Sequence, residues 1–122
     1  MLFTTQPVPI AIIPSYENPI TYKGPIRWKT LPCVWQEKEL ALHENQDGGK
    51  SRNGRPVYTI THRPTGLAII MDIPRKDEAI RVMKQLVKVA DWEFGLQTIQ
   101  NPEFMRKLTD QTEDIRTNCR RV

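Results

Sequence analysis

Residues 57–73 read VYTITHRPTGLAIIMDI, and this stretch decides the fold. Two runs with alternating side chains flank Arg63-Pro64-Thr65-Gly66, whose proline and glycine suit a type I turn. Pairing His62 with Leu67 makes the two alternations agree, and a slip of one residue would destroy the agreement. One face of the resulting hairpin is large and apolar, with Tyr58, Ile60, His62, Leu67, Ile69 and Met71. The other face is small and half-polar, with Thr59, Thr61, Ala68 and Ile70, and we expect it to meet solvent or a partner.

The next segment, residues 76–90, has the period of an amphipathic helix. Its apolar residues recur at steps of three and four positions, and they are Ala79, Ile80, Met83, Leu86, Val87 and Ala90. Acids lie in the first turn (Asp77 and Glu78) and Lys88 lies in the last, as the helix dipole favours. We expect the apolar stripe to pack on the large face of the hairpin.

A second helix is predicted over about residues 102–117. Asn101-Pro102-Glu103 combines an N-cap residue, a proline at the first helical position and an acid in the first turn. Upstream, residues 26–29 alternate like a strand, and residues 36–43 fit either a helix or a strand, with the nearby hairpin favouring a strand. The sequence therefore predicts an α+β fold: a small antiparallel sheet of three or more strands, including the 57–73 hairpin, packed against helix 76–90.

The first 25 residues form a proline-rich segment that is expected to be extended. Five of the ten prolines lie there, and proline fixes φ and disfavours helix at the preceding residue. This arm is apolar and without charge until Glu17, so it needs a surface to cover. An edge strand on its own domain is favoured, and docking on another subunit or partner is the alternative. We expect one domain over residues 1–122: the arm (1–25), the sheet (26–73) and two helices (76–118).

Features of location point to a cytoplasmic protein. Only two cysteines occur, Cys33 and Cys119, which suits reduced thiols. The N-terminus has no basic region of a signal peptide, and the apolar run at residues 10–13 is too short to span a bilayer. We therefore expect no association with a membrane.

Motifs for chemistry are missing from the sequence. Cys33, His43, His62 and Cys119 have none of the spacings of metal ligands. No nucleophile motif occurs, and Gly49-Lys50-Ser51 resembles the end of a phosphate-binding loop except that Glu44 replaces its first glycine. We predict no catalytic residue, no metal and no cofactor, and hence a binding protein rather than an enzyme.

Charge gives the main functional hypothesis. The formal net charge is +4, and residues 48–71 contain four cations and no acid. We expect this window to bind nucleic acid, with phosphate contacts from Lys50, Arg52, Arg55 and Arg63, and with Thr59 and Thr61 facing the groove or strand. Strands followed by a packed helix resemble, in outline, the arm-type domains of integrases and some small single-strand binders. No diagnostic residue of either family matches position by position, so the resemblance concerns topology alone.

The alternative hypothesis is a protein-interaction module, such as a regulator, an inhibitor or an assembly subunit. Its interface would use apolar residues of the arm and exposed tryptophans, which are typical anchors of interfaces. The candidates are Ile10, Ile12, Ile13, Trp28 and Trp35. On this hypothesis the partner is another protein or a second copy of the chain.

Overall fold

Two antiparallel sheets and two long helices make up the fold. The computed structural model describes residues 7–12, 24–45, 54–95 and 97–120. Strand β1 (Val8–Ile12) pairs with β2 (Arg27–Leu31), and a second sheet has the order β3 (Trp35–Glu37), β4 (Leu40–Glu44), β5 (Tyr58–His62) and β6 (Leu67–Ile73). Helix α1 (Lys76–Val89), the short 3₁₀ helix η1 (Thr98–Gln100) and helix α2 (Pro102–Arg120) follow. The predicted α+β class is confirmed.

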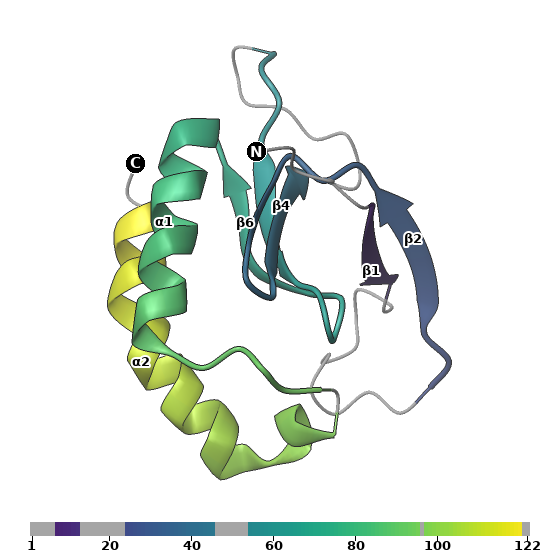
Figure 1. Ribbon diagram of the computed structural model, residues 1–122, viewed down its shortest axis with the longest axis vertical. Coiled ribbons are helices and arrows are strands. Elements are labelled where there is room, and N and C mark those ends of the chain that lie inside the picture. The colour runs from purple at the N-terminus through teal and green to yellow at the C-terminus, as the bar shows by residue number, and fades with distance from the viewer. Residues whose placement is uncertain (1–6, 13–23, 46–53, 96, 121–122) are drawn as a thin grey trace.

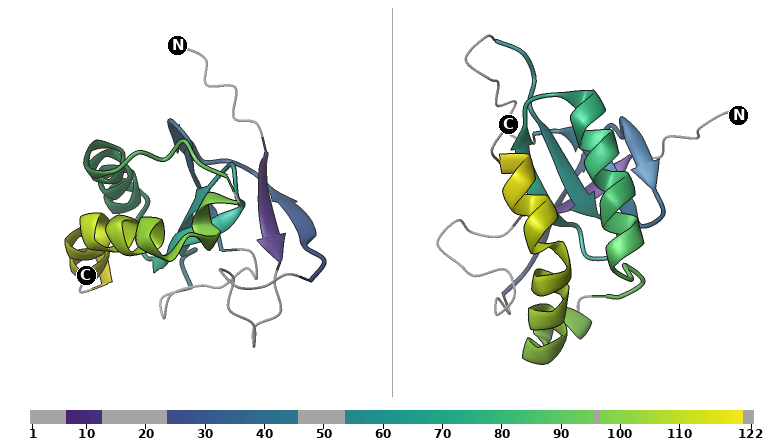
Figure 2. Two further views of the ribbon diagram at one scale, coloured as in Figure 1. Left: turned by 90° about the horizontal axis from the view of Figure 1, so that it is seen from below. Right: turned by 90° about the vertical axis from the view of Figure 1, so that its left-hand side faces the viewer.

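The four-stranded sheet lies between two layers. Helices α1 and α2 lie on one side of this sheet, and the β1–β2 pair lies on the other (Figure 1). Figure 2 shows the same arrangement from two further directions. None of the helices in the described ranges is both long enough and apolar enough to cross a membrane.

The main core fills the space between the sheet and the helices. Strands β4, β5 and β6 and helix α1 contribute most of it, as Leu40, Leu42, Ile60, Ile70, Ile73, Ala79, Val82, Met83 and Leu86, joined by Trp92 and Leu108. The predicted helix 76–90 is confirmed, and Val82 belongs to its buried stripe in addition to the predicted residues. The amphipathic pattern therefore stabilises α1 mainly through this contact, because isolated helices of such length are marginal in water.

The predicted hairpin is present, but its register differs over half its length. His62 pairs with Leu67 and Thr61 with Ala68, as expected, whereas Ile60 pairs with Ile70 and Tyr58 with Ile73. Two irregularities shift the pairing, and Asp72 in the distorted part of β6 has a φ of 61°. The predicted faces are therefore wrong for the end of β6. Ile70 belongs to the core, while Met71, expected on the core face, is 49% exposed.

The described part of the arm lies on its own domain, as favoured by the sequence. Strand β1 pairs with β2, and the backbone N–H of Ala11 donates a hydrogen bond to the carbonyl of Gly66 at 2.9 Å. Val8 and Ile10 are buried in a second, smaller core with Cys33 and Ala41. The rest of the arm lies outside the described residues, except for residues 24 and 25 before β2.

The ambiguous segment 36–43 is a strand pair, which confirms the favoured interpretation. Strands β3 and β4 are joined by a tight turn in which Lys38 has a φ of 50°. The second helix begins as predicted, because the Oδ1 of Asn101 accepts the backbone N–H of Glu103 and of Phe104. Helix α2 continues to Arg120, three residues beyond the predicted end.

Candidate functional site

The β5–β6 turn meets the β1–β2 pair at Gly66. This glycine has a φ of +71°, a conformation that residues with a Cβ rarely adopt. A Cβ placed on it would lie 2.5 Å from Cζ3 of Trp28 and 2.9 Å from the backbone nitrogen of Ala11. The indole of Trp28 therefore rests directly on the backbone of the turn, and the hydrogen bond from Ala11 fixes β1 beside it.

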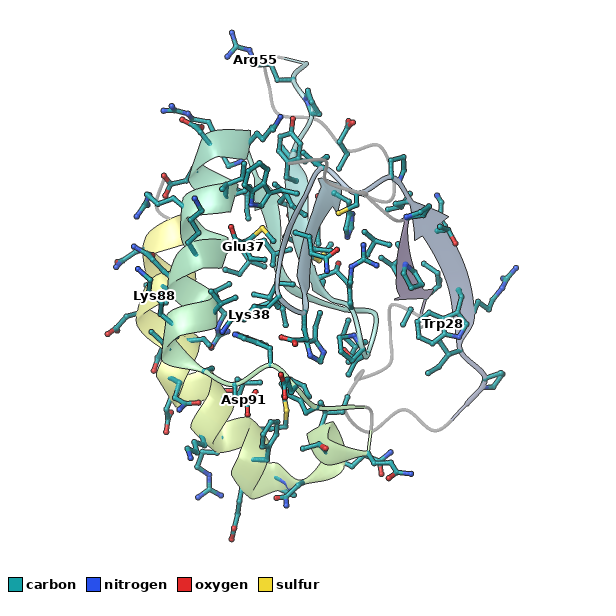
Figure 3. All side chains as sticks on the ribbon, viewed as in Figure 1. Trp28, Glu37, Lys38, Arg55, Lys88 and Asp91 are labelled. Carbon is teal, nitrogen blue, oxygen red and sulfur yellow. The ribbon has the colours of Figure 1, made fainter. Side chains whose placement is uncertain are left out.

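Strand β2 presents most of its surface to solvent. Arg27, Trp28, Lys29 and Thr30 are all exposed, and the Trp28 side chain is 51% exposed despite its contact with Gly66. Figure 3 shows Trp28 on the strand farthest from the helices. Because successive residues of a strand point to opposite faces, Arg27 and Lys29 leave β2 on the side away from the indole. The strand thus offers an aromatic ring on one face and two cations on the other.

No acidic residue occurs in β1, in β2 or in residues 54–71. Four basic residues do occur there, namely Arg27, Lys29, Arg55 and Arg63. The two segments are distant in the sequence, and the contact at Gly66 joins them. The fold therefore extends the acid-free window of the sequence with a second segment that also lacks acids.

Of the four basic residues predicted for nucleic-acid contact, the two in the described part of the chain do not lie together. Arg55 is exposed and points away from the molecule at one end of the sheet (Figure 3), whereas Arg63 follows β5 at its other end. Eight residues of extended chain span about 26 Å. The Arg63 guanidinium is only partly exposed, and its Nη1 donates to the carbonyl of Pro7 at 3.3 Å. Lys50 and Arg52 lie outside the described residues.

The predicted open face with Thr59 and Thr61 is instead a buried polar layer. These threonines are 3% and 1% exposed. The Thr59 hydroxyl donates to Oδ1 of Asn45 at 2.6 Å, and the Asn45 amide donates to Oδ1 of Asp72 at 2.5 Å. The Thr61 hydroxyl lies 2.6 Å from Nε2 of His43. The expectation that both threonines face a ligand is therefore wrong, because the chain itself uses their hydroxyls.

His43 belongs to the same buried layer. Its Nδ1 lies 2.7 Å from the carbonyl of Glu44, which can only accept, so Nδ1 carries the proton and Nε2 accepts from Thr61. Burial lowers the pKa of His43, and the bond to Glu44 opposes this shift. The pocket beside His43 and Thr61 has a volume of about 40 Å³. Sites for small molecules are typically about 300–1,000 Å³, so this pocket has room for little more than water.

His62 holds the base of the turn. Its Nε2–H donates to the carbonyl of Trp92 at 2.6 Å, and its Nδ1 lies 2.9 Å from the hydroxyl of Thr65. The ring stacks on Phe94 with centroids 4.1 Å apart. Burial lowers the pKa of His62, against the opposing effects of the Trp92 carbonyl and of Glu39. These contacts tie the turn to the segment between the helices and favour a structural role for His62.

Most of the predicted partner-binding residues are used within the chain. Ile10 is buried and Ile12 half-buried in the second core, and Ile13 lies outside the described residues. Trp35 packs against the main core, and its Nε1 donates to Oε1 of Glu37 at 2.9 Å. Among the four candidates within the described ranges, only Trp28 is largely exposed. The sequence identified this tryptophan, but Gly66 was visible only as a turn residue.

Comparisons with known proteins give no further indication of function. No protein-family model matches the chain, and no curated protein and no solved structure shows significant similarity to it. No group of three or more histidine, cysteine or acidic side chains within the described ranges is arranged to hold a metal ion. The exposed strand β2 and its surroundings are therefore the feature that bears on function.

Proposed function

We propose that the chain is a small nucleic-acid-binding domain that contacts phosphates with the cations of β2 and of the segment before β5. The observation that carries this proposal is that β1, β2 and residues 54–71 contain no acidic residue. Arg27 and Lys29 are exposed on β2, which meets the β5–β6 turn at Gly66, and Arg55 is exposed at the opposite end of the sheet. Lysine and arginine that neutralise phosphates release condensed counterions, which provides most of the affinity of such surfaces.

Some cations on the side of the helices lie beside acids. On α1, Arg81 is paired with Glu78, and just before α1, Arg75 is paired with Asp77. On α2, basic and acidic residues occur in equal number along the helix. Such mixed surfaces are typical of solvated helices and attract a polyanion weakly. Both helices carry acids among their basic residues, whereas β1 and β2 carry none, and this supports placing the nucleic acid on the side of β2.

The salt dependence of binding tests the proposal. A fluorescent oligonucleotide is titrated with the full chain at several salt concentrations, and the logarithm of the affinity is plotted against that of the salt concentration. We expect a negative slope, and we expect the double substitution Arg27→Ala and Lys29→Ala to make it shallower by about 1.4 for a single strand, from ~0.7 per phosphate contact. Affinity that does not depend on salt would remove the proposal.

A matched control is available on helix α2. Arg106 and Lys107 are both exposed and, like Arg27 and Lys29, are one arginine and one lysine. Replacing both with alanine changes the net charge by the same amount on the side of the helices. We expect the slope of this variant to stay close to that of the unaltered chain. If the slope became shallower by the same amount in both variants, the net charge of the chain, rather than the surface of β2, would account for binding of the oligonucleotide.

A protein-interaction module is the second candidate function. The exposed Trp28 favours it, because half-exposed tryptophans on rigid elements are typical anchors of protein interfaces. The proposed docking through the arm has less support, since β1 already covers its own domain. Light scattering of Trp28→Ala and of the unaltered chain tests a second copy as the partner. An unchanged monomeric mass in both would argue against self-association through Trp28.

A further inference from the structure

We infer that the nucleic acid bound by this domain is single-stranded and that one of its bases stacks on the indole of Trp28. This inference rests on the proposed function and adds the class of ligand. Two observations carry it: the Trp28 ring is half exposed, and it is seated on the Gly66 backbone at a distance that no side chain at that position would permit.

The contact with Gly66 orders the indole of Trp28 before a ligand binds. A side chain that must be ordered on binding loses rotamer entropy, and this loss reduces the affinity. The contact with the turn, together with the Ala11 hydrogen bond beside it, restricts the indole before any ligand arrives. One side of the Trp28 ring is covered by the protein, and much of the remainder is open to solvent. A planar base can stack there with little further ordering of the protein.

The cations of β2 give the charge that a single strand requires. Arg27 and Lys29 precede and follow Trp28 in an exposed strand, each about 3.3 Å along it, and leave β2 on the face opposite the indole. Because β2 is an edge of its two-stranded sheet, the backbone of a single strand would pass around this edge to reach them. Proteins that bind single strands combine aromatic rings for the bases with basic residues for the backbone. In a duplex the bases are stacked inside the helix and cannot reach such a ring without being flipped out. Charge alone therefore fits either form, whereas the ring favours the single strand.

Fluorescence anisotropy with two labelled probes tests the inference. The probes are an oligo(dT) of about 20 nucleotides, which fits the site sizes of about 4–16 nucleotides known for single-strand binders, and a duplex of the same length. We expect the unaltered chain to prefer oligo(dT). Trp28→Leu, which keeps an apolar side chain against Gly66, should lose roughly five- to 150-fold in affinity for oligo(dT) and little for the duplex. Trp28→Phe should retain more affinity than Trp28→Leu.

Quenching of tryptophan fluorescence gives a second readout. Trp92 is 2% exposed and Trp35 is half-buried against the core, so oligo(dT) should quench mainly Trp28. We expect the quenching to disappear in Trp28→Phe and to persist in the control Trp35→Phe. Circular dichroism of each variant shows whether it is folded. A folded Trp28→Leu variant that binds oligo(dT) like the unaltered chain would overturn the inference.

The other outcomes separate this inference from the proposed function. Equal affinity for duplex and oligo(dT), with the expected salt dependence, would overturn stacking on Trp28 and leave the phosphate contacts in place. Absence of binding to either probe at low salt would overturn both. If a poly-glutamate peptide of similar charge displaces oligo(dT) as effectively as unlabelled oligo(dT) does, the surface recognises acidic chains in general, and the inference is overturned. Failure of the peptide to compete supports it.

Discussion

Replacing Gly66 with alanine tests the contact on which the candidate site depends. The new methyl group would meet two neighbours, Cζ3 of Trp28 at 2.5 Å and the backbone nitrogen of Ala11 at 2.9 Å. The indole can move outward into solvent. The Ala11 nitrogen has less freedom, because its N–H donates to the carbonyl of Gly66 itself and its strand is paired with β2. The substitution should therefore strain the backbone and separate the two strand pairs.

The expected loss in the free energy of unfolding has two parts. A φ of +71° costs a residue with a Cβ about 1–2 kcal/mol relative to glycine. Inserting a methyl group into filled space adds typically ~1–3 kcal/mol. The sum, about 2–5 kcal/mol, is a large share of the ~5–15 kcal/mol by which a domain of this size is usually stable. We expect urea denaturation of Gly66→Ala to show a loss within this range, with an unchanged dependence on denaturant.

Gly54 gives a matched control. Its φ is +75°, almost that of Gly66, but nothing lies within 4 Å of the position of its Cβ. Gly54→Ala should therefore cost only the backbone part, about 1–2 kcal/mol. The difference between the two variants isolates the contacts at Gly66. Combining Gly66→Ala with Trp28→Ala then separates the ring from Ala11, because removing the indole should recover part of the loss and leave the rest.

The result that would refute this reasoning is equal destabilisation by the two glycine substitutions. Equal losses would mean that neither Trp28 nor β1 presses on Gly66 in solution. The indole would then lack the contact with Gly66 that orders it before a ligand binds, and stacking on Trp28 would lose its main support. If Trp28→Ala recovered more stability than the difference between Gly66→Ala and Gly54→Ala, the proposed division of the lost stability would also be contradicted.

Three further predictions concern the histidines, a helix cap and the core. Burial lowers the pKa of His43 and of His62 below 6.5, so the unfolded chain binds more protons than the folded chain near and below that pH. Their contribution to stability is therefore complete above about pH 6.5 and decreases as the pH falls toward the folded pKa values, and thermal melts of the unaltered chain and of His62→Gln should differ in this pH dependence. Asn101→Ala should cost about 1 kcal/mol in denaturation, whereas Asn101→Asp should retain the cap and most of the stability. Leu86→Ala should cost about 2–5 kcal/mol because Leu86 is fully buried, while Val89→Ala, at an exposed position of the same helix, should stay within about 0.5 kcal/mol.

Local patterns were sufficient to predict the helices. The apolar spacing of residues 76–90 and the cap at Asn101 depend on interactions within a few residues, and the structure confirms both elements. The turn at residues 63–66 was predictable for the same reason, because proline restricts the backbone angles of a turn and glycine permits angles that other residues avoid. The pairing of His62 with Leu67 next to this turn follows directly from its length.

The far end of the hairpin was not predictable by counting positions from the turn. Each irregularity in β6 adds a residue on one strand, and every later side chain then changes face. The Asp72 carboxylate accepts from Asn45, which also binds Thr59, so a tertiary network accompanies the distortion. No pattern within β6 indicates a partner that lies 27 positions away in the chain.

The burial of Thr59 and Thr61 was unpredictable for a similar reason. Thr59 and Thr61 alternate with apolar residues, as side chains on a solvent face do, but both are buried, and Asn45 and His43 bind their hydroxyls. A threonine is small enough to be buried when its hydroxyl has a partner, and the sequence alone does not reveal Asn45 or His43 as that partner. The sequence shows the basic residues between positions 48 and 71. That Arg55 and Arg63 lie at opposite ends of β5 follows only from the strand between them.

The position of Trp28 links binding to the stability of the fold. Strand β2 contacts the rest of the domain through β1, through Leu31 in the second core and through the contact of Trp28 with Gly66. A ligand that binds the indole and the neighbouring cations only when β2 is docked on the turn must favour the docked state, because binding to the folded form alone stabilises it. At a free concentration of 100 times the dissociation constant this stabilisation is ~2.7 kcal/mol, comparable with the expected cost of Gly66→Ala. Saturating oligo(dT) should therefore raise the melting temperature of the unaltered chain, and it should do so less for Trp28→Leu. If the two increases were equal, the ligand would be held elsewhere than on this ring.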